Sequence, residues 1–378
     1  MDLKGMFQTF ARLFALCLAA AVLPAGTARA NGLAAFLAEL EPAGLAPGAD
    51  AFGPVSPETK TAPILKNGET VAWAFLTSDF VGTTGYSGKP IHVVAGIDKD
   101  AVLTGVKLVE HSEPIILIGI PNSKMVALTE GYAGLDLKVE AATGGEGHDL
   151  DIISGATVTI MVIDDSLVRA GIKVSRLMGL GGLAPAQDKG PPREIDMGQT
   201  HVQDWTTLAG DGSVRRMTLD VGQVNAAFEA TGEAAIKRPE PGAPDDTFID
   251  MHMALVSVPS IGRSLLGDGE YKNLQGRLKE GEHAILVLGR GSYSFKGSGY
   301  VRGGIFDRIQ LIQGDNSVRF FDKQQQRLGD LATTGSPSFT ELDIFIIPAD
   351  AEFDPAEPFR LQLLVQRAIG AVKKSFLT

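Results

Sequence analysis

One short segment of the sequence combines residue types that can bind or carry a phosphate group. It reads Asp151-x-x-Ser154-Gly155-Ala156-Thr157 and precedes a long apolar stretch that predicts a helix. Ser154 is a favourable N-cap, and Gly155 and Ala156 leave the first helical turn open to a ligand. Amides at a helix N-terminus have no intrahelical partner, so this turn can hold a phosphate by hydrogen bonds or present the Thr157 hydroxyl for esterification. Asp151 could orient Thr157 or bind a metal during such a transfer.

The same segment also fits an ordinary capped helix that follows a strand. The choice depends on a resemblance: the segment is similar to the flavinylation motif, D-x-x-[ST]-G-A-T, of covalent FMN-binding domains. The resemblance implies that Thr157 carries FMN through a phosphoester bond, attached outside the cytoplasm by a separate flavin transferase. It also implies that Asp151, Ser154, Gly155 and Ala156 contribute to cofactor binding.

Two upstream stretches resemble other parts of the same domain. Gly85-Tyr86-Ser87-Gly88 precedes a predicted strand, and His111-Ser112-Glu113-Pro114 follows another. His111 and Glu113 would share one face of an extended segment, where the resemblance implies contact with the flavin. Tyr86 could stack on the isoalloxazine ring or fill the core. Common members of the family have Glu-Thr-Pro-Gly where this chain has Glu113-Pro114 and an apolar run, which weakens any transfer of detailed ring contacts.

A narrower resemblance involves two further stretches. The run Glu113–Pro121 and the segment Tyr293–Asp307 are similar to the NosR/NirI family of membrane flavoproteins that accompany nitrous oxide or nitrite reduction. This resemblance implies a periplasmic part of a membrane protein, in electron transfer supporting nitrous oxide reductase activity, expression or maturation. It implies as partners a membrane electron-transfer region, absent from this sequence, and a periplasmic nitrous oxide reductase or its maturation factors.

The fold class predicted from the pattern of elements is α+β. An FMN-binding domain of antiparallel strands with flanking helices is expected to be followed by a second, strand-rich domain. In the first domain, runs of β-branched and apolar residues predict strands at 71–77, 91–97, 101–109 and 135–141. Helices are predicted at 123–132 and 157–178. The predicted organisation is a signal peptide at 1–30, a lead-in segment at 31–70, an FMN-binding domain at 71–183, a linker at 184–195, a strand-rich second domain at 196–354 and a C-terminal helix at 355–378 leading towards a missing membrane region.

The first thirty residues are typical of an export signal. Lys4 and Arg12 precede an apolar run from Leu13 to Leu23, and Ala28-Arg29-Ala30 resembles a cleavage site. An N-terminal membrane anchor is the alternative. Cleavage would remove Cys17, the only cysteine, which suits an oxidising compartment. The sequence therefore predicts a protein on the periplasmic side of the inner membrane, anchored there in a full-length protein.

Composition excludes several other classes of protein. The chain has 378 residues, 45 acidic and 34 basic, so a formal net charge of -11 disfavours contact with nucleic acid. One cysteine cannot build a disulfide framework, a zinc site of several cysteines or an iron–sulfur cluster. Hydrophobic residues make up 44%, which is too much for a disordered chain.

Three weaker candidates remain in the sequence. His148 lies in an acidic loop, which could assist a metal during flavin transfer but is more typical of a solvated surface. Met251-His252-Met253 offers soft ligands for copper, although alternation on a strand would separate the histidine from both methionines. The segment 289–304 mixes basic and aromatic residues, which suits either a docking face for an acidic partner or hairpin packing.

Two functional alternatives stay open on the sequence alone. One is a flavin-carrying subunit of an ion-pumping oxidoreductase of the Rnf or Nqr type, which shares the motif but should lack the second domain. The other is a non-redox sensor or assembly module that binds FMN weakly or not at all. In each case the chain is expected to act as a component of a larger system rather than as a stand-alone enzyme.

Overall fold

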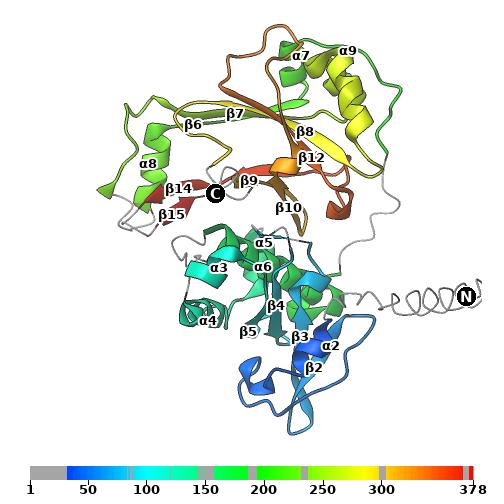
Figure 1. Cartoon of the computed structure of the whole chain (residues 1–378), viewed down its shortest axis with the longest axis vertical. Helices are drawn as coiled ribbons and strands as arrows, with labels where there is room; N and C mark the ends of the chain where they lie inside the picture. Colours follow the sequence, from blue (N-terminus) through cyan, green and yellow to red (C-terminus); the bar gives the residue numbers. More distant parts are fainter. Residues whose placement is uncertain are drawn as a thin grey trace, which may run out of the picture.

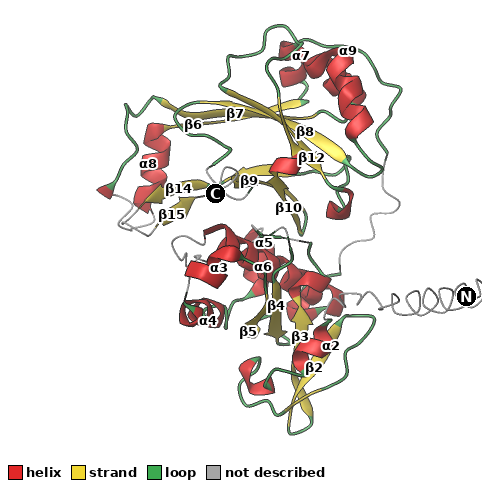
Figure 2. Cartoon of the chain, in the orientation of Figure 1, coloured by secondary structure: helices red, strands yellow, loops and turns green. Residues whose placement is uncertain are grey.

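The computed structural model divides into two units (Figure 1). We call residues 32–185 the first unit and residues 194–377 the second unit. The described residues are 32–82, 84–85, 87, 89–119, 121–143, 148, 157–185, 194–230, 237–297, 304–368 and 374–377. The predicted signal peptide at 1–30 lies outside them. The predicted α+β class is confirmed, because helices and antiparallel sheets occur in both units (Figure 2).

The first unit contains a five-stranded antiparallel sheet in which the strands follow one another in chain order. Sequential antiparallel neighbours need only short connections, which matches the turn chemistry of the sequence. The strands are β1 Ala51–Phe52, β2 Thr61–Lys66, β3 Glu69–Leu76, β4 His92–Ile97 and β5 Leu103–Glu110. The predicted hairpin at 96–100 is confirmed as the connection between β4 and β5.

Both faces of this sheet are covered, and the alternation of side chains along β4 shows how. Val93 and Ala95 face a core built with the long helix α6, Thr157–Met178, whereas Val94 packs with residues of the preceding segment. That segment includes α2, Leu33–Leu37, and the strands β1 and β2. The interpretation of residues 31–70 as a mere lead-in is therefore wrong, because they supply two strands and one covering layer of the sheet.

Two glycines make this covering layer possible. A Cβ atom on Gly96 would lie 2.4 Å from the Leu45 carbonyl oxygen, and one on Gly105 would lie 2.7 Å from the Gly44 carbonyl oxygen. A larger residue at either position would clash with the backbone at 44–45 and push this segment off the sheet. That movement would expose Leu45, which is fully buried.

The helices of the first unit lie on the other face of the sheet and at its edge. They are α3 Pro114–Gly119, α4 Asn122–Glu130, α5 Leu137–Thr143 and α6 Thr157–Met178. Of the 3₁₀ turns, η1 Pro42–Gly44 belongs to the covering layer on the first face, η2 Thr77–Asp79 follows β3, and η3 Leu180–Gly182 follows α6. The strand predicted at 135–141 is wrong, because α5 occupies most of it. Leu137 and Glu140 are buried at a spacing of three residues while Val139 is exposed, which is the helical pattern.

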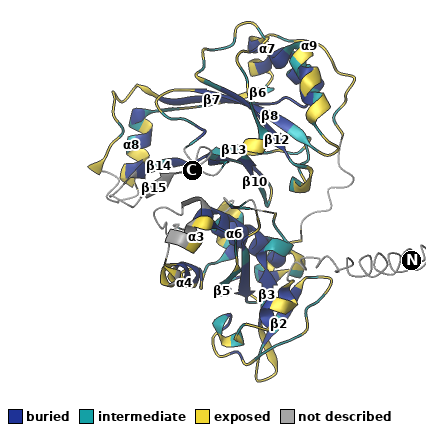
Figure 3. Ribbon diagram, viewed as in Figure 1, coloured by how far each residue is buried: buried dark blue, intermediate teal, exposed yellow. Residues whose placement is uncertain are grey.

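The second unit contains two antiparallel sheets that enclose a common core. Buried residues from both sheets form this core, and they are coloured dark blue in Figure 3. The larger sheet has the order β11-β12-β8-β7-β6 and the smaller one β10-β9-β13. Their bounds are β6 Val214–Asp220, β7 Thr247–Leu255, β8 His283–Arg290, β9 Ile305–Gln313, β10 Asn316–Phe321, β11 Gln325–Arg327, β12 Glu341–Ile347 and β13 Arg360–Leu363.

Helices cover the outer face of the larger sheet. The helices α7 Trp205–Gly210 and α9 Pro259–Arg277 pack a separate cluster against it, and α8 Val221–Ala230 closes the interior beside β6. The 3₁₀ turns η5 Asp322–Gln324 and η6 Ala349–Ala351 follow β10 and β12. Helix α9 breaks at Gly267, whose φ of 73° is left-handed.

The C-terminal helix predicted at 355–378 is wrong. Its apolar residues have helical spacing, but the structure places them in β13 and in a two-stranded ribbon of β14 Val365–Ala368 and β15 Lys374–Leu377. Leu361 pairs with Leu311 and Leu363 with Ile309, so pairing with β9 overrides the local pattern. Within the described residues, no helix is long and apolar enough to span a membrane.

The two units contact each other through helix α6 and strand β10. Arg176 of α6 donates a 2.7 Å hydrogen bond to Asp315, and Ser317 of β10 donates to Asp165 of α6. Ile305 of the second unit is fully buried within the core cluster of the first. The second unit therefore packs on the helix that begins at the predicted flavinylation motif (Figure 1).

Candidate functional site

The structure describes part of the site that the sequence predicts. Asp151, Ser154, Gly155, Ala156 and Tyr86 lie outside the described residues. Thr157 is the first residue of α6, as the motif predicts, and His111 and Glu113 follow β5.

Helix α6 is held firmly enough to position the motif at its N-terminus. Ile160, Ile163 and Leu167 are fully buried against the sheet, and each such side chain contributes about 1.5–3 kcal/mol. The helix spans 22 residues, and the partial positive charge at its start lies next to Thr157. This end of the helix is therefore a fixed, electropositive place for a phosphate.

Glu113 is a fully buried carboxylate that joins three segments near this helix start. The Thr159 hydroxyl of α6 donates a 2.9 Å hydrogen bond to one carboxylate oxygen, and the Ser87 amide donates a 3.0 Å bond to the other. A Cβ atom on Gly85 would lie 2.5 Å from the carboxyl carbon, so only glycine permits this approach. We call Glu113, Thr159, Ser87 and Gly85 the Glu113 hub.

His111 turns back onto the same hub. Its Nδ1 accepts a 3.3 Å hydrogen bond from the Glu113 amide. A neutral ring that accepts at Nδ1 carries its proton at Nε2, so Nε2 is a donor. Glu113 is fully buried, whereas His111 is half-buried.

His148 occupies a place that the sequence did not indicate. Its Nε2 lies 2.9 Å from an Asp164 oxygen of α6, and its Nδ1 lies 3.1 Å from a Glu140 oxygen of α5. The Tyr132 hydroxyl donates to the same Asp164 oxygen at 2.9 Å. Hydrogen bonds to Asp164 and then Glu140 raise the pKa of His148 to about 10, against a smaller opposing effect of burial. The imidazolium thus links α5 and α6 through one ion pair to each helix, an arrangement that we call the His148 clamp.

His148 therefore lies in neither of the surroundings considered for it. It is mostly enclosed rather than solvated, with 18% of its side chain exposed. Among the described residues no group of three or more histidine, cysteine and acidic side chains has the arrangement of a metal site. The partners that complete the clamp, Glu140 and Asp164, were missed, because a buried acid at helical spacing looks like a surface acid in sequence.

The candidates in the second unit form structural contacts. Met251 is buried between the sheets, whereas His252 lies on the opposite face beside Trp205, with ring centroids 5.2 Å apart. In the 289–304 segment, Phe295 is fully buried and Lys296 pairs with Asp343 at 2.6 Å. These positions favour hairpin packing over a docking face for the described part of that segment.

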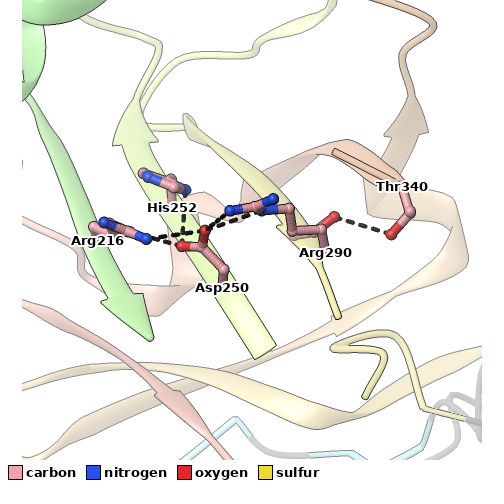
Figure 4. A network of polar contacts seen from close by, with 6 residues as sticks. Arg216, Asp250, His252, Arg290 and Thr340 are labelled. Atoms are coloured by element: carbon pink, nitrogen blue, oxygen red, sulfur yellow. Dashed lines mark hydrogen bonds and ion pairs between the residues drawn. The ribbon is translucent and has the colours of Figure 1, made fainter. Parts of the chain in front are cut away.

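A polar network on the larger sheet lies next to this histidine (Figure 4). Arg216 and Arg290 from the flanking strands each donate two hydrogen bonds to Asp250, at 2.7 to 3.1 Å. Burial opposes ionisation of Asp250, but the bonds from both arginines outweigh it and lower its pKa. Burial lowers the pKa of His252, so the ring is neutral at pH 7. The network ties three strands together.

Comparison with known proteins agrees with the geometry of the first unit. Residues 85–171 match the FMN-binding domain family. The chain is 40% identical to the regulatory protein NosR of Pseudomonas aeruginosa, over 82% of this chain and 44% of that protein. It is 37% identical to the regulatory protein NosR of Stutzerimonas stutzeri, over 99% of this chain and 52% of that protein.

A third relative has a different name. The protein NirI of Paracoccus denitrificans is 31% identical over 86% of this chain and 46% of its own length. The chain thus spans about half the length of the curated relatives that it matches. No solved structure shows a significant match.

Proposed function

The chain belongs to the NosR/NirI family and contains an FMN-binding domain, and from this premise we propose that it carries FMN covalently on Thr157. The observation that carries the proposal is the position of the motif. The D-x-x-[ST]-G-A-T pattern ends on the first residue of α6, inside the matched domain. The bond would join the Thr157 hydroxyl oxygen to the FMN phosphate, with the overall loss of one water.

The residues around the helix start fit a phosphate-linked group. The N-terminal end of α6 attracts the phosphate charge, and the buried contacts of α6 prevent it from shifting. The Glu113 hub fixes Gly85 and Ser87 at a constant distance from the first turn. His148, nine residues before Thr157, is held by ion pairs to α5 and α6. When bound, FMN supplies one- or two-electron chemistry at its isoalloxazine ring.

The proposed role is electron transfer that supports nitrous oxide reductase activity, expression or maturation, on the periplasmic side of the inner membrane. The support is the similarity to proteins named NosR and NirI. The proposed partners are a flavin transferase, a membrane electron-transfer region and a periplasmic nitrous oxide reductase or its maturation factors. A covalent tether suits this compartment, because FMN lost outside the cytoplasm could not be replaced from it.

The intact mass of the exported protein tests the attachment. Protein made in a host with an active flavin transferase is expected to gain the mass of FMN less one water. The Thr157→Val variant is expected to lack that gain completely, since valine has no hydroxyl. Thr143→Val is the matched control, because Thr143 lies on α5 outside the motif. An adduct that persists in Thr157→Val, or that is missing from correctly exported wild-type protein, contradicts the proposal.

The two alternative functions make different predictions for this chain. A subunit of the Rnf or Nqr type should lack a second domain, whereas this chain has a second unit with its own hydrophobic cores. A sensor or assembly module that does not use flavin predicts normal behaviour of the Thr157→Val variant. Nitrous oxide reduction by cells carrying this variant in the full-length protein therefore separates electron transfer from a scaffold role.

A further inference from the structure

A cavity of about 370 Å³ lies where the two units meet. The first unit contributes the segment after η2, which includes Phe80 and Thr84, and Lys173 from α6. The second unit contributes β10 and the turns η5 and η6. We call this space the junction cavity. Ligand sites are common at domain interfaces, and this volume lies near the lower end of the usual range for such sites.

Arg319 of β10 lines the junction cavity and has unused hydrogen-bonding capacity. Its residue surface is only 9% exposed, yet it makes no hydrogen bond or ion pair with any described residue. Asp165, the carboxylate that attracts Arg319 most strongly, already accepts a 2.8 Å bond from Arg169 and another from Ser317. Burial lowers the pKa of Arg319, although Asp165 opposes this effect. Its Nε atom is buried without a hydrogen-bond partner, and a buried guanidinium is costly unless an acceptor reaches it.

Lys173 adds a second cation to the same cavity. Its ammonium group donates one 3.1 Å hydrogen bond, to the Phe80 carbonyl oxygen, and no other described acceptor lies in reach. Burial lowers the pKa of Lys173, while Glu352 and Asp315 partly counteract it. Asp315 is itself paired with Arg176, so it does not neutralise the lysine. Two of the three donors of Lys173 remain for a ligand.

The remaining walls indicate what kind of anion would fit. The partly buried rings of Phe80 and Phe321 line the cavity, whereas Asp350, Glu352 and Lys323 lie exposed at its edge. The interior is thus cationic with apolar sides, and the edge carries mixed charge. We propose that the junction cavity binds a small organic carboxylate with an apolar body, held by Arg319 and Lys173.

This ligand would bridge the two units. Arg319 belongs to the second unit and Lys173 to the first, so the carboxylate replaces missing partners on both sides at once. Charge-assisted hydrogen bonds of this kind are the strongest in proteins. Binding is therefore expected to stabilise the packing of β10 on α6. Lys173 lies 16 residues after Thr157 on α6, which is about 24 Å along the helix axis, so we expect binding not to depend on the flavin.

Calorimetric titration of the full chain with three probes tests the proposal. Benzoate provides a carboxylate with a ring, acetate a carboxylate alone, and inorganic phosphate an oxyanion of another class. Saturable binding of benzoate is expected, about tenfold or more tighter than acetate, because the ring leaves water. Lys173→Met is expected to weaken benzoate binding about tenfold, since it removes a charge-assisted bond. Lys138→Met, on an exposed ion pair of α5, is the matched control.

Several outcomes would overturn this inference. Phosphate binding without benzoate binding would refute the carboxylate class, and equal affinities for acetate and benzoate would refute the apolar body. Binding that is unchanged in folded Lys173→Met would refute the position of the site. Repeating the titration with Thr157→Val separates this result from the proposed flavin attachment, because the cavity is expected to bind equally well without FMN.

Discussion

Two buried charged residues face helix α6, and their surroundings differ. Glu113, near the start of the helix, is fully buried and accepts hydrogen bonds from Thr159 and Ser87. Arg319, beside the middle of the helix, is almost as deeply buried but makes no hydrogen bond with a described residue. A buried charge with hydrogen-bond partners is explained by the fold itself, whereas a buried charge without them suggests that a ligand supplies the partner.

The difference also reflects how each group reaches the helix. Glu113 comes from the same unit as α6, and its contacts are made by neighbouring segments of one core. Arg319 comes from the second unit, lines the junction cavity and interacts electrostatically with Asp165 and Arg169. The comparison teaches that the contacts around the start of α6 form within the first unit, whereas the contacts along its later part require both units.

The largest expected effect comes from removing the satisfied charge. Glu113→Ala leaves the Thr159 hydroxyl and the Ser87 amide without their acceptor in a buried place. We expect the free energy of unfolding to fall by about 3 kcal/mol, measured by urea denaturation. Glu130→Ala is the matched control, because Glu130 is exposed at the end of α4. A loss as small as that of the control would mean that the Glu113 hub does not hold this region.

The His148 clamp gives the next largest effect, and it depends on pH. The folded pKa of about 10 exceeds the unfolded value of 6.5, so the ion pairs stabilise fully below pH 6.5 and this stability is lost as pH rises towards 10. We expect His148→Gln to cost about 2 kcal/mol at pH 6, after allowance for solvent screening, and much less at pH 10.

Urea denaturation of wild type and His148→Gln at pH 6, 8 and 10 measures this difference. The exposed His201 provides the control substitution His201→Gln, which should change the unfolding free energy little at any of these pH values. A cost of His148→Gln that stays constant across the range would show that the clamp does not titrate as the geometry requires.

The sequence predicted the region around the start of α6 much better than the region around Arg319. The motif located the start of α6, and the strands at 71–77, 91–97 and 101–109 are confirmed as β3, β4 and β5, because alternation and turn chemistry are local signals. Of the hub residues, Gly85 and Ser87 were noted in the sequence only as part of a family pattern, and only Glu113 was predicted as a site residue. Its partner Thr159 looks like any helical threonine until the fold brings it to the carboxylate.

The errors have different causes. Pairing of β13 with β9 overrides the helical pattern within 355–378, whereas the buried residues of 137–143 follow helical spacing that the predicted strand overlooked. Arg319 and Lys173 are 146 residues apart in the sequence, and nothing local marks either as part of one cavity. Contacts between distant segments cannot be derived from periodicity alone.

The smallest expected effect is the sharpest test of the comparison. Arg319→Met replaces an unsatisfied buried cation with an apolar side chain of similar length. Because no hydrogen bond with a described residue is lost, we expect the unfolding free energy without added ligand to change by less than about 1 kcal/mol, in either direction. Arg327→Met at an exposed position of β11 is the control. A loss of unfolding free energy close to that of Glu113→Ala would mean that the charges of Asp165 and its neighbours stabilise Arg319. The arginine would then have a structural role in the fold. A near-zero change combined with loss of benzoate binding would instead assign the side chain to the ligand, because only a bound anion would then account for keeping a guanidinium there.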